Sequence, residues 1–156
     1  MYTPTVGDEG FGLLKAALRD YLINDTTITS ELPSGQYGVI DEGFLTETTL
    51  TPCIMFATVG DGQSAAVRDA SLVRLIVYVV DRGRGLLKIE RILNRVRRRL
   101  NSTEAALSFL TFPVGTLVVE HIEASGSSSS ASLPAWKAEA RGVYVFMTVR
   151  GLEADY

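Results

Sequence analysis

The sequence predicts an α+β fold in which two main helices pack on one face of a mostly antiparallel sheet. Two segments, 8–25 and 86–100, carry apolar residues at steps of three and four, which is the helical period. Runs of alternating or continuous apolar residues have the length of strands, at 53–59, 72–80, 117–124 and 138–149. Loops join neighbouring strands and no strand–helix–strand unit repeats, so antiparallel pairing is expected to dominate.

The first helix is expected to begin at Asp8 or Glu9 and to end near Asn24-Asp25. Its apolar face consists of Phe11, Leu14, Leu18 and either Tyr21 or Leu22. Polar and turn-forming residues follow, so the next segment is predicted to be a connection that contains one short strand at 37–40.

The central part of the chain predicts two strands joined by a hairpin. Pro52 precedes the apolar run 53–59, and Gly60-Asp61-Gly62 is expected to end that strand and to open a mobile loop over 60–70. The strand at 72–80 is apolar on both faces apart from Arg74, which predicts a position at the centre of the sheet.

A glycine-rich turn at 82–85 leads into a helix that is both amphipathic and strongly basic. Its apolar stripe, which is expected to pack on the sheet with Leu87 and Ile92 widening it, consists of Leu86, Ile89, Leu93, Val96 and Leu100. The pattern therefore predicts one helix face in the core and the opposite face in solvent.

The last third of the chain is predicted to hold two strands separated by a serine-rich segment. Residues 125–132 have too little apolar area to order themselves, so a mobile loop is expected there. The final strand begins near Trp136 or Ala138 and ends at about Val149. We predict a single domain for residues 1–156, with an ordered core at about 8–150 and flexible loops at 60–70 and 125–132.

Metal ligands and cofactor motifs are not indicated by the sequence. One cysteine, Cys53, and one histidine, His121, are too few soft ligands for a closed zinc site. The glycine-rich turn places Lys88 where a dinucleotide-binding fingerprint needs a small residue, and Gly-Lys-Ser or Gly-Lys-Thr does not occur. These glycines are expected to make a tight turn, and neither a metal nor a cofactor is expected.

An enzyme is not expected either, because no group of catalytic residues converges in the sequence. His121 lies between Glu120 and Glu123 on a predicted strand, without a nucleophile placed near it. No secretory signal and no apolar run of membrane-spanning length stand out, which predicts a soluble protein of a reducing cytoplasm.

The basic helix is the feature that points to a function. Residues 81–100 carry eight cationic and two acidic side chains, a net charge of +6, so the remainder must carry −9 to give the chain its −3. The residues spaced to form one cationic stripe are Lys88, Arg91, Arg95 and Arg98. An ordinary solvated face would interleave charges of both signs, and this helix has almost no acidic residues, so we expect a partner to neutralise the stripe.

Three kinds of partner carry the negative charge that the stripe needs: a nucleic acid, a membrane surface and a second copy of the chain. Nucleic-acid modules usually add aromatic stacking residues, and this helix has none. A membrane would need large apolar residues beside the stripe, and the apolar side is committed to the core. An identical subunit fits better, because a head-to-tail contact between basic helix and acidic remainder can close into a ring.

The order of elements resembles the tail-terminator family of long-tailed bacteriophages, also called tail-completion or tail-to-head joining proteins. The resemblance covers roughly residues 8–150 and includes a Pro-led strand at 51–56 and a helix of the pattern Leu-x-x-Ile-x-x-Ile-Leu-x-x-Val-x-x-x-Leu at 86–100. It implies a structural virion protein that assembles, usually as a hexamer, into a ring. The ring caps the tail tube and provides the surface for joining the head.

The resemblance also implies partners and sites. The partners would be the subunit itself, a tail-tube protein and a head-connector protein, with possible contact to passing DNA and none to a membrane. The location would be the tail or neck of a virion assembled in the host cytoplasm. The stripe would face a neighbour or the channel, and both hairpin loops would order against partners through Asp61, Gln63, Arg68, Asp69, Ser127, Ser128 and Ser129.

Two alternatives stay open, a DNA-binding module that uses the basic helix 86–100 and another neck or tail-tube ring protein. The missing counter-charges predict that changing Arg91, Arg95 and Arg98 together to Gln leaves the melting temperature near its original value and abolishes ring formation or tail joining.

Overall fold

A computed structural model describes residues 8–67, 70–83, 86–101, 117–125, 129–133 and 138–151. Its six strands form one sheet in the order β1-β2-β3-β6-β4, with β5 paired to β6 as well. The strands are β1 (Val39–Asp41), β2 (Cys53–Val67), β3 (Ala70–Asp81), β4 (Leu117–Ala124), β5 (Ser129–Leu133) and β6 (Ala138–Gly151). Only β1 and β2 pair in parallel; the other described pairs are antiparallel, which confirms the predicted α+β class.

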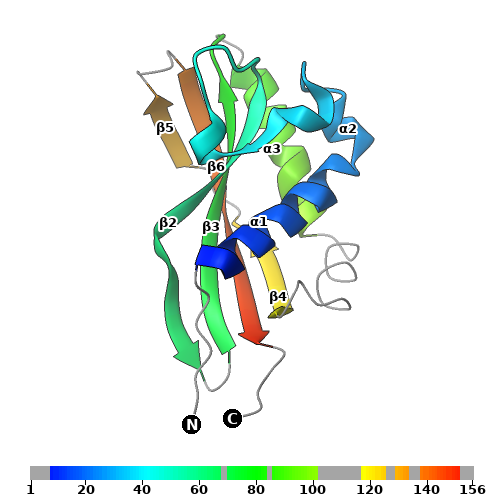
Figure 1. Ribbon diagram of the computed structural model, residues 1–156. Coiled ribbons are helices and arrows are strands. Elements are labelled where there is room, and N and C mark those ends of the chain that lie inside the picture. Colours follow the sequence, from blue (N-terminus) through cyan, green and yellow to red (C-terminus); the bar gives the residue numbers. More distant parts are fainter. Residues whose placement is uncertain are drawn as a thin grey trace.

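The strand β3 lies at the centre of the sheet, between β2 and β6 (Figure 1). Its alternate residues Val73, Leu75, Val77 and Val79 are buried in the main core. On its other face Ile76 and Val80 are buried as well. A strand covered on both faces is what its nearly continuous apolar sequence predicted.

Two long helices, α1 (Asp8–Ile23) and α3 (Leu86–Leu100), lie on the same side of the sheet (Figure 1). The predicted apolar face of α1 is confirmed for Leu14, Leu18, Tyr21 and Leu22, which join the same core as α3, whereas the side chain of Phe11 lies outside the described part of the chain. Both Tyr21 and Leu22 are buried, since α1 lies against α2 (Thr26–Thr29) and β1 as well as against the sheet. Two short 3-10 helices, η1 (Gly35–Gly38) and η2 (Glu42–Phe44), flank β1.

A second, smaller core covers part of the opposite face of the sheet. It consists of Leu45, Cys53, Met55, Val80, Ala138 and Ala140. Arg82 holds the adjoining loop in place, because its guanidinium donates hydrogen bonds to the carbonyl oxygens of Thr46, at 2.7 Å, and of Thr49. The chain bends at Arg82 and Gly83 after β3, where Asp81 Oδ1 accepts a hydrogen bond from the Gly83 N–H at 3.2 Å; the rest of the predicted turn, 84–85, lies outside the described residues.

The predicted loop at 60–70 is wrong over most of its length, because β2 continues to Val67 and β3 begins at Ala70. The pairing register shifts between Thr58 and Gln63 and again between Gln63 and Ala66. Glycines inside a strand often mark such bulges instead of ending the strand. Figure 1 shows the β2–β3 arm extending beyond the helices.

The predicted serine loop at 125–132 is also partly wrong. Ser129–Leu133 forms the strand β5, which pairs antiparallel with residues 138–142 of β6. Main-chain hydrogen bonds to a neighbouring strand edge order such a segment without apolar side chains. Residues 102–116 and 152–156 lie outside the described part of the chain.

Candidate functional site

The outer face of α3 is the candidate site. Apolar spacing places Ile89, Ile92, Leu93, Val96 and Leu100 in the core, as predicted. Leu87 does not widen that apolar stripe, contrary to the prediction, because it lies on the opposite face of the helix with 87% of its surface exposed. The site therefore combines the basic stripe with one large apolar side chain in solvent.

Asp25 is the main acidic partner of the stripe. Its carboxylate oxygen Oδ2 lies 2.9 Å from Arg95 Nε and 3.8 Å from Arg99 Nε, and its side chain is only 4% exposed. Asp25 Oδ1 also accepts a hydrogen bond from the Thr27 N–H at 2.9 Å, so the same carboxylate caps α2. Asp25 thus ties the α1–α2 junction to α3.

Arg99 reinforces this junction through Tyr21. Its guanidinium lies over the Tyr21 ring, 4.2 Å from the ring centre, and the Tyr21 hydroxyl donates a hydrogen bond to the Arg99 carbonyl oxygen at 2.8 Å. A cation over an aromatic face is attracted by the ring quadrupole, more strongly where water is excluded.

Two further ion pairs connect α3 to the rest of the fold. Arg91 Nη2 lies 2.9 Å from Glu31 Oε2, and Glu90 Oε1 lies 2.7 Å from Arg141 Nη1 of β6. The prediction that something outside the chain must neutralise the stripe is therefore wrong for Arg91 and Arg95. Their counter-charges stand 60 and 70 residues away along the chain, where periodicity within one helix cannot find them.

The expected result of the triple Gln variant changes for the same reason. Arg95→Gln would leave the buried Asp25 carboxylate without its closest cation, and an uncompensated buried charge is strongly destabilising. That variant would lower the melting temperature, so it cannot isolate assembly from stability.

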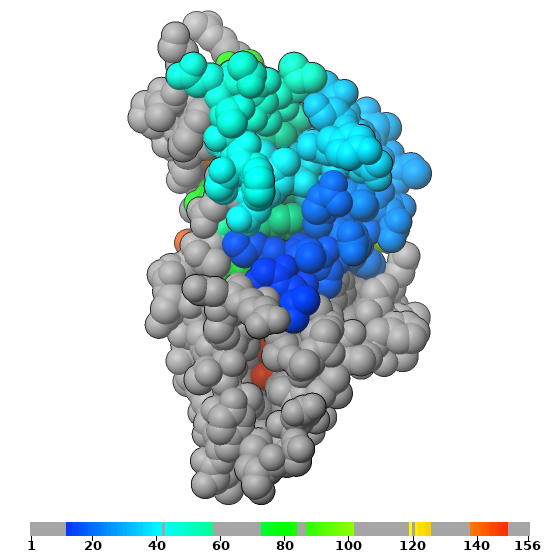
Figure 2. Space-filling model, viewed as in Figure 1, coloured from blue at the N-terminus to red at the C-terminus, as the bar shows by residue number. Residues whose placement is uncertain are grey.

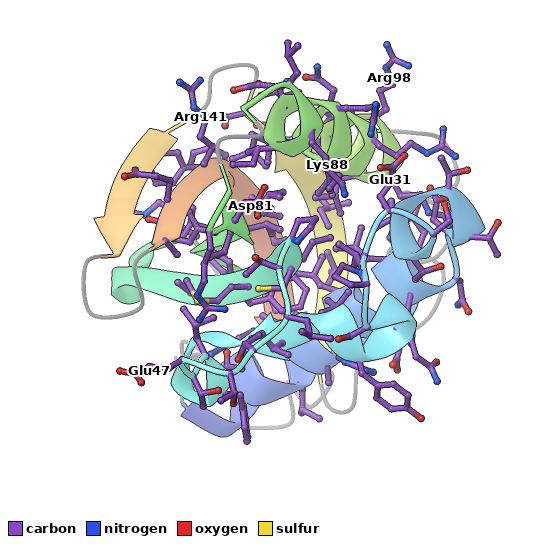
Figure 3. The ribbon with its side chains drawn as sticks, turned by 90° about the horizontal axis from the view of Figure 1, so that it is seen from above. Glu31, Glu47, Asp81, Lys88, Arg98 and Arg141 are labelled. Atoms are coloured by element: carbon purple, nitrogen blue, oxygen red, sulfur yellow. The ribbon has the colours of Figure 1, made fainter. Side chains whose placement is uncertain are left out.

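Lys88 and Arg98 are the two stripe cations that form no ion pair with any residue the structure describes. Arg98 is exposed, and Figure 3 shows it pointing away from α3. A groove of about 500 Å³ runs between α2 and α3, and Leu87 and Arg98 both line it, together with Ile28. An exposed apolar residue, Leu87, thus lines the same groove as Arg98, one of the two cations of the stripe without an ion pair in the described part of the chain.

The predicted partner-binding loops are not brought to this face by anything the structure describes. Asp61 and Gln63 belong to β2, and Ser129 opens β5 opposite Gly142. The remaining loop residues lie outside the described part of the chain, namely Arg68, Asp69, Ser127 and Ser128. Their predicted contacts stay predictions.

A second groove lies on the other side of the molecule, between α1 and the segment around β1. Its volume is also about 500 Å³, and apolar residues form most of its wall, among them Ala16, Val39 and Phe56. Tyr37 and Phe44 stand at it with 73% and 72% of their surfaces exposed. Figure 2 shows α1 and this segment side by side on one face. Sequence reasoning missed this groove, because its walls come from three separate segments.

The candidate catalytic groups do not converge in the described residues. His121 Nε2 lies 3.6 Å from Glu123 Oε2, and both side chains are exposed. Cys53 is buried in the second core, and this burial raises the pKa of its thiol to about 11, so it is protonated at neutral pH. No group of three metal-ligating side chains occurs within the described ranges.

The lowered pKa of Asp25 gives a testable dependence on acid. Burial raises the pKa, but the hydrogen bonds from Arg95 and the Thr27 N–H, with the charge of Arg95, outweigh it and hold the pKa below its usual 3.8. A lowered folded-state pKa stabilises the fold above the unfolded value, and this contribution is lost as pH falls through the folded value. We therefore expect the melting temperature to decrease as the pH is lowered below about 4.

Calorimetry of the unmodified protein and of Asp25→Asn from pH 7 to pH 2 checks this dependence. The variant lacks the titrating group, so its melting temperature should fall less steeply in acid. Parallel curves for the two proteins would contradict the assignment to Asp25.

No helix in the described part of the chain is both long and apolar enough to cross a membrane. No protein-family model matches the chain, and no curated protein matches it at significant similarity.

Proposed function

We propose that this protein is a ring-forming structural subunit of a bacteriophage tail, a tail terminator that caps the tail tube and offers a surface for head joining. The α+β fold agrees with the family resemblance. Copy number six and the tube and connector partners come from that resemblance.

The observation that carries the proposal is the composition of the outer face of α3. Leu87 is the most exposed large apolar residue in the described part of the chain, and Lys88 and Arg98 lack ion pairs there. Exposing an apolar side chain beside unpaired cations suits a surface that another protein covers. The net charge of −3 makes a second copy of this chain a suitable partner for such a surface.

DNA binding is less well supported. Asp25 and Glu31 neutralise Arg95 and Arg91, which leaves fewer cations to contact phosphates. Affinity for duplex DNA that falls by about 0.9 logarithmic units per phosphate contact for each decade of salt would favour this alternative.

The double variant Lys88→Gln with Arg98→Gln tests the ring. Both side chains lie outside the ion pairs of α3, so we expect the free energy of unfolding to change by no more than about 0.5 kcal/mol. We expect the variant to lose self-association, so that light scattering no longer detects multiples of 16.9 kDa. We also expect it to lose any capping of tail tubes, which electron microscopy would show.

The matched control is Lys88→Arg with Arg98→Lys, which exchanges the two cations and keeps the charge. It should assemble like the unmodified protein. If the double Gln variant assembled equally well, the cationic face of α3 would not be the assembly surface.

A further inference from the structure

The groove between α1 and β1 has the features of a receptor for an apolar side chain. Ala16, Val39 and Phe56 contribute apolar wall, and the exposed rings of Tyr37 and Phe44 stand at it. Gly12 lies on the same wall, and a Cβ added there would meet no atom within 4 Å, so the space above this turn of α1 is open. Two large aromatic surfaces left in water at one groove indicate that something covers them.

Leu87 is an apolar side chain of the kind that such a groove accepts. It lines the groove between α2 and α3, which shares no lining residue with the groove between α1 and β1. Figure 3 shows Arg98, from the α3 groove, at one side of the molecule and Glu47, three residues after Phe44, at the other. A projection and a hollow on different sides of one subunit can meet only between subunits, and the contact they make is head-to-tail.

Among the residues that the structure describes, the charged side chains without ion pairs beside the two surfaces include some of opposite sign. Lys88 and Arg98 accompany Leu87 and lack ion pairs within the described residues. On the groove side, Asp20 lies one helical turn after Ala16, and Glu47 follows Phe44; neither has an ion-pair partner in the part of the chain that is described. The groove wall also holds two cations: Lys15, which pairs with Asp41 at 2.8 Å, and Arg19, whose guanidinium donates hydrogen bonds to the carbonyl oxygens of Val39 and Gln36.

We propose that Leu87 of one copy inserts into the α1–β1 groove of the next copy, between Tyr37 and Phe44, with Lys88 and Arg98 facing Asp20 and Glu47. This inference rests on the proposed ring function and names its subunit interface. Repetition of the contact around a closed circle buries every Leu87 and covers every groove, whereas a rotation that fails to close would give a filament.

Cysteine cross-linking tests this contact directly. In the variant Leu87→Cys with Phe44→Cys, a short bismaleimide should join neighbouring copies and give a ladder of covalent oligomers on a denaturing gel. Cys53 serves as an internal control, because it is buried and should not react. The matched control is Leu87→Cys with Glu123→Cys, since Glu123 is exposed on β4, away from the groove; it should give no ladder.

A second variant, Leu87→Asp, separates the contact from folding. Because Leu87 is exposed in the monomer, the melting temperature of the Leu87→Asp variant should equal that of the unmodified protein. Light scattering of this variant should detect no species larger than the monomer. Two results would overturn this interface and leave the ring function intact. One is that the Leu87→Asp variant still forms rings. The other is that the variant Leu87→Cys with Phe44→Cys forms rings but gives no ladder of cross-linked oligomers.

Two other outcomes of these experiments would also overturn the proposed contact. Dimers formed by Leu87→Cys alone would show a symmetric contact through α3 and overturn the head-to-tail arrangement. If the unmodified protein stayed a monomer at every concentration, the ring proposal and this interface would both fall.

Discussion

Asp25→Asn is expected to lower the free energy of unfolding by about 3 kcal/mol, and the melting temperature by roughly 6–12 °C for a chain of this length. The substitution keeps the shape of the side chain and much of its ability to cap α2, so the loss comes from the missing charge. Arg99, only 12% exposed, would lose its buried anion. Breaking a buried pair costs about 3–5 kcal/mol, and the lower end applies here because Arg95 is 44% exposed.

Thermal unfolding followed by circular dichroism measures this effect. The control is Glu31→Gln, which breaks the more exposed pair with Arg91 and should cost no more than about 1 kcal/mol. Equal melting temperatures for Asp25→Asn and Glu31→Gln would mean that the Asp25 carboxylate does not hold the α1–α2 junction to α3.

Gly142→Ala should destabilise the fold by about 3 kcal/mol, the upper part of the range for overpacking. A Cβ at this position would lie 2.8 Å from Tyr78 Cδ1 and 2.9 Å from the Val77 carbonyl oxygen, closer than real contacts allow. The Tyr78 ring could move, but Val77 is fixed by the β3–β6 ladder, in which it stands opposite Val143. The strain therefore falls on the centre of the sheet.

Urea unfolding of this variant should shift the midpoint without a large change in slope. Gly12→Ala is the matched control, because a Cβ there meets nothing within 4 Å and alanine favours a helix interior by about 0.5–1 kcal/mol over glycine. The two substitutions should change stability in opposite directions. A Gly142→Ala protein as stable as the unmodified one would show that β3 and β6 lie farther apart than described.

The elements that the sequence predicted correctly are those in which neighbouring residues carry the signal. The apolar period of three to four residues is local to α1 and α3, and the apolar run of β3, interrupted only by Arg74 over residues 72–80, implied burial on both faces. The misplaced segments are those in which pairing overrides composition. Gly60 and Gly62 sit within β2 at an irregularity, after which β2 pairs with β3 again from Gln63, and Ser129 and Ser130 belong to β5, which pairs with β6.

For the candidate site, too, the sequence predicted one part and the tertiary structure decided the other. The positions of Lys88, Arg91, Arg95 and Arg98 on one cationic face followed from their spacing along a single helix. Which of these cations remain available did not follow, because the carboxylates of Asp25 and Glu31 reach α3 only when the chain folds. The aromatic groove at α1 is likewise assembled from separate segments. Helical period and net charge are properties of the chain as written, whereas ion pairing and open surface depend on distances in space, which the tertiary structure alone sets.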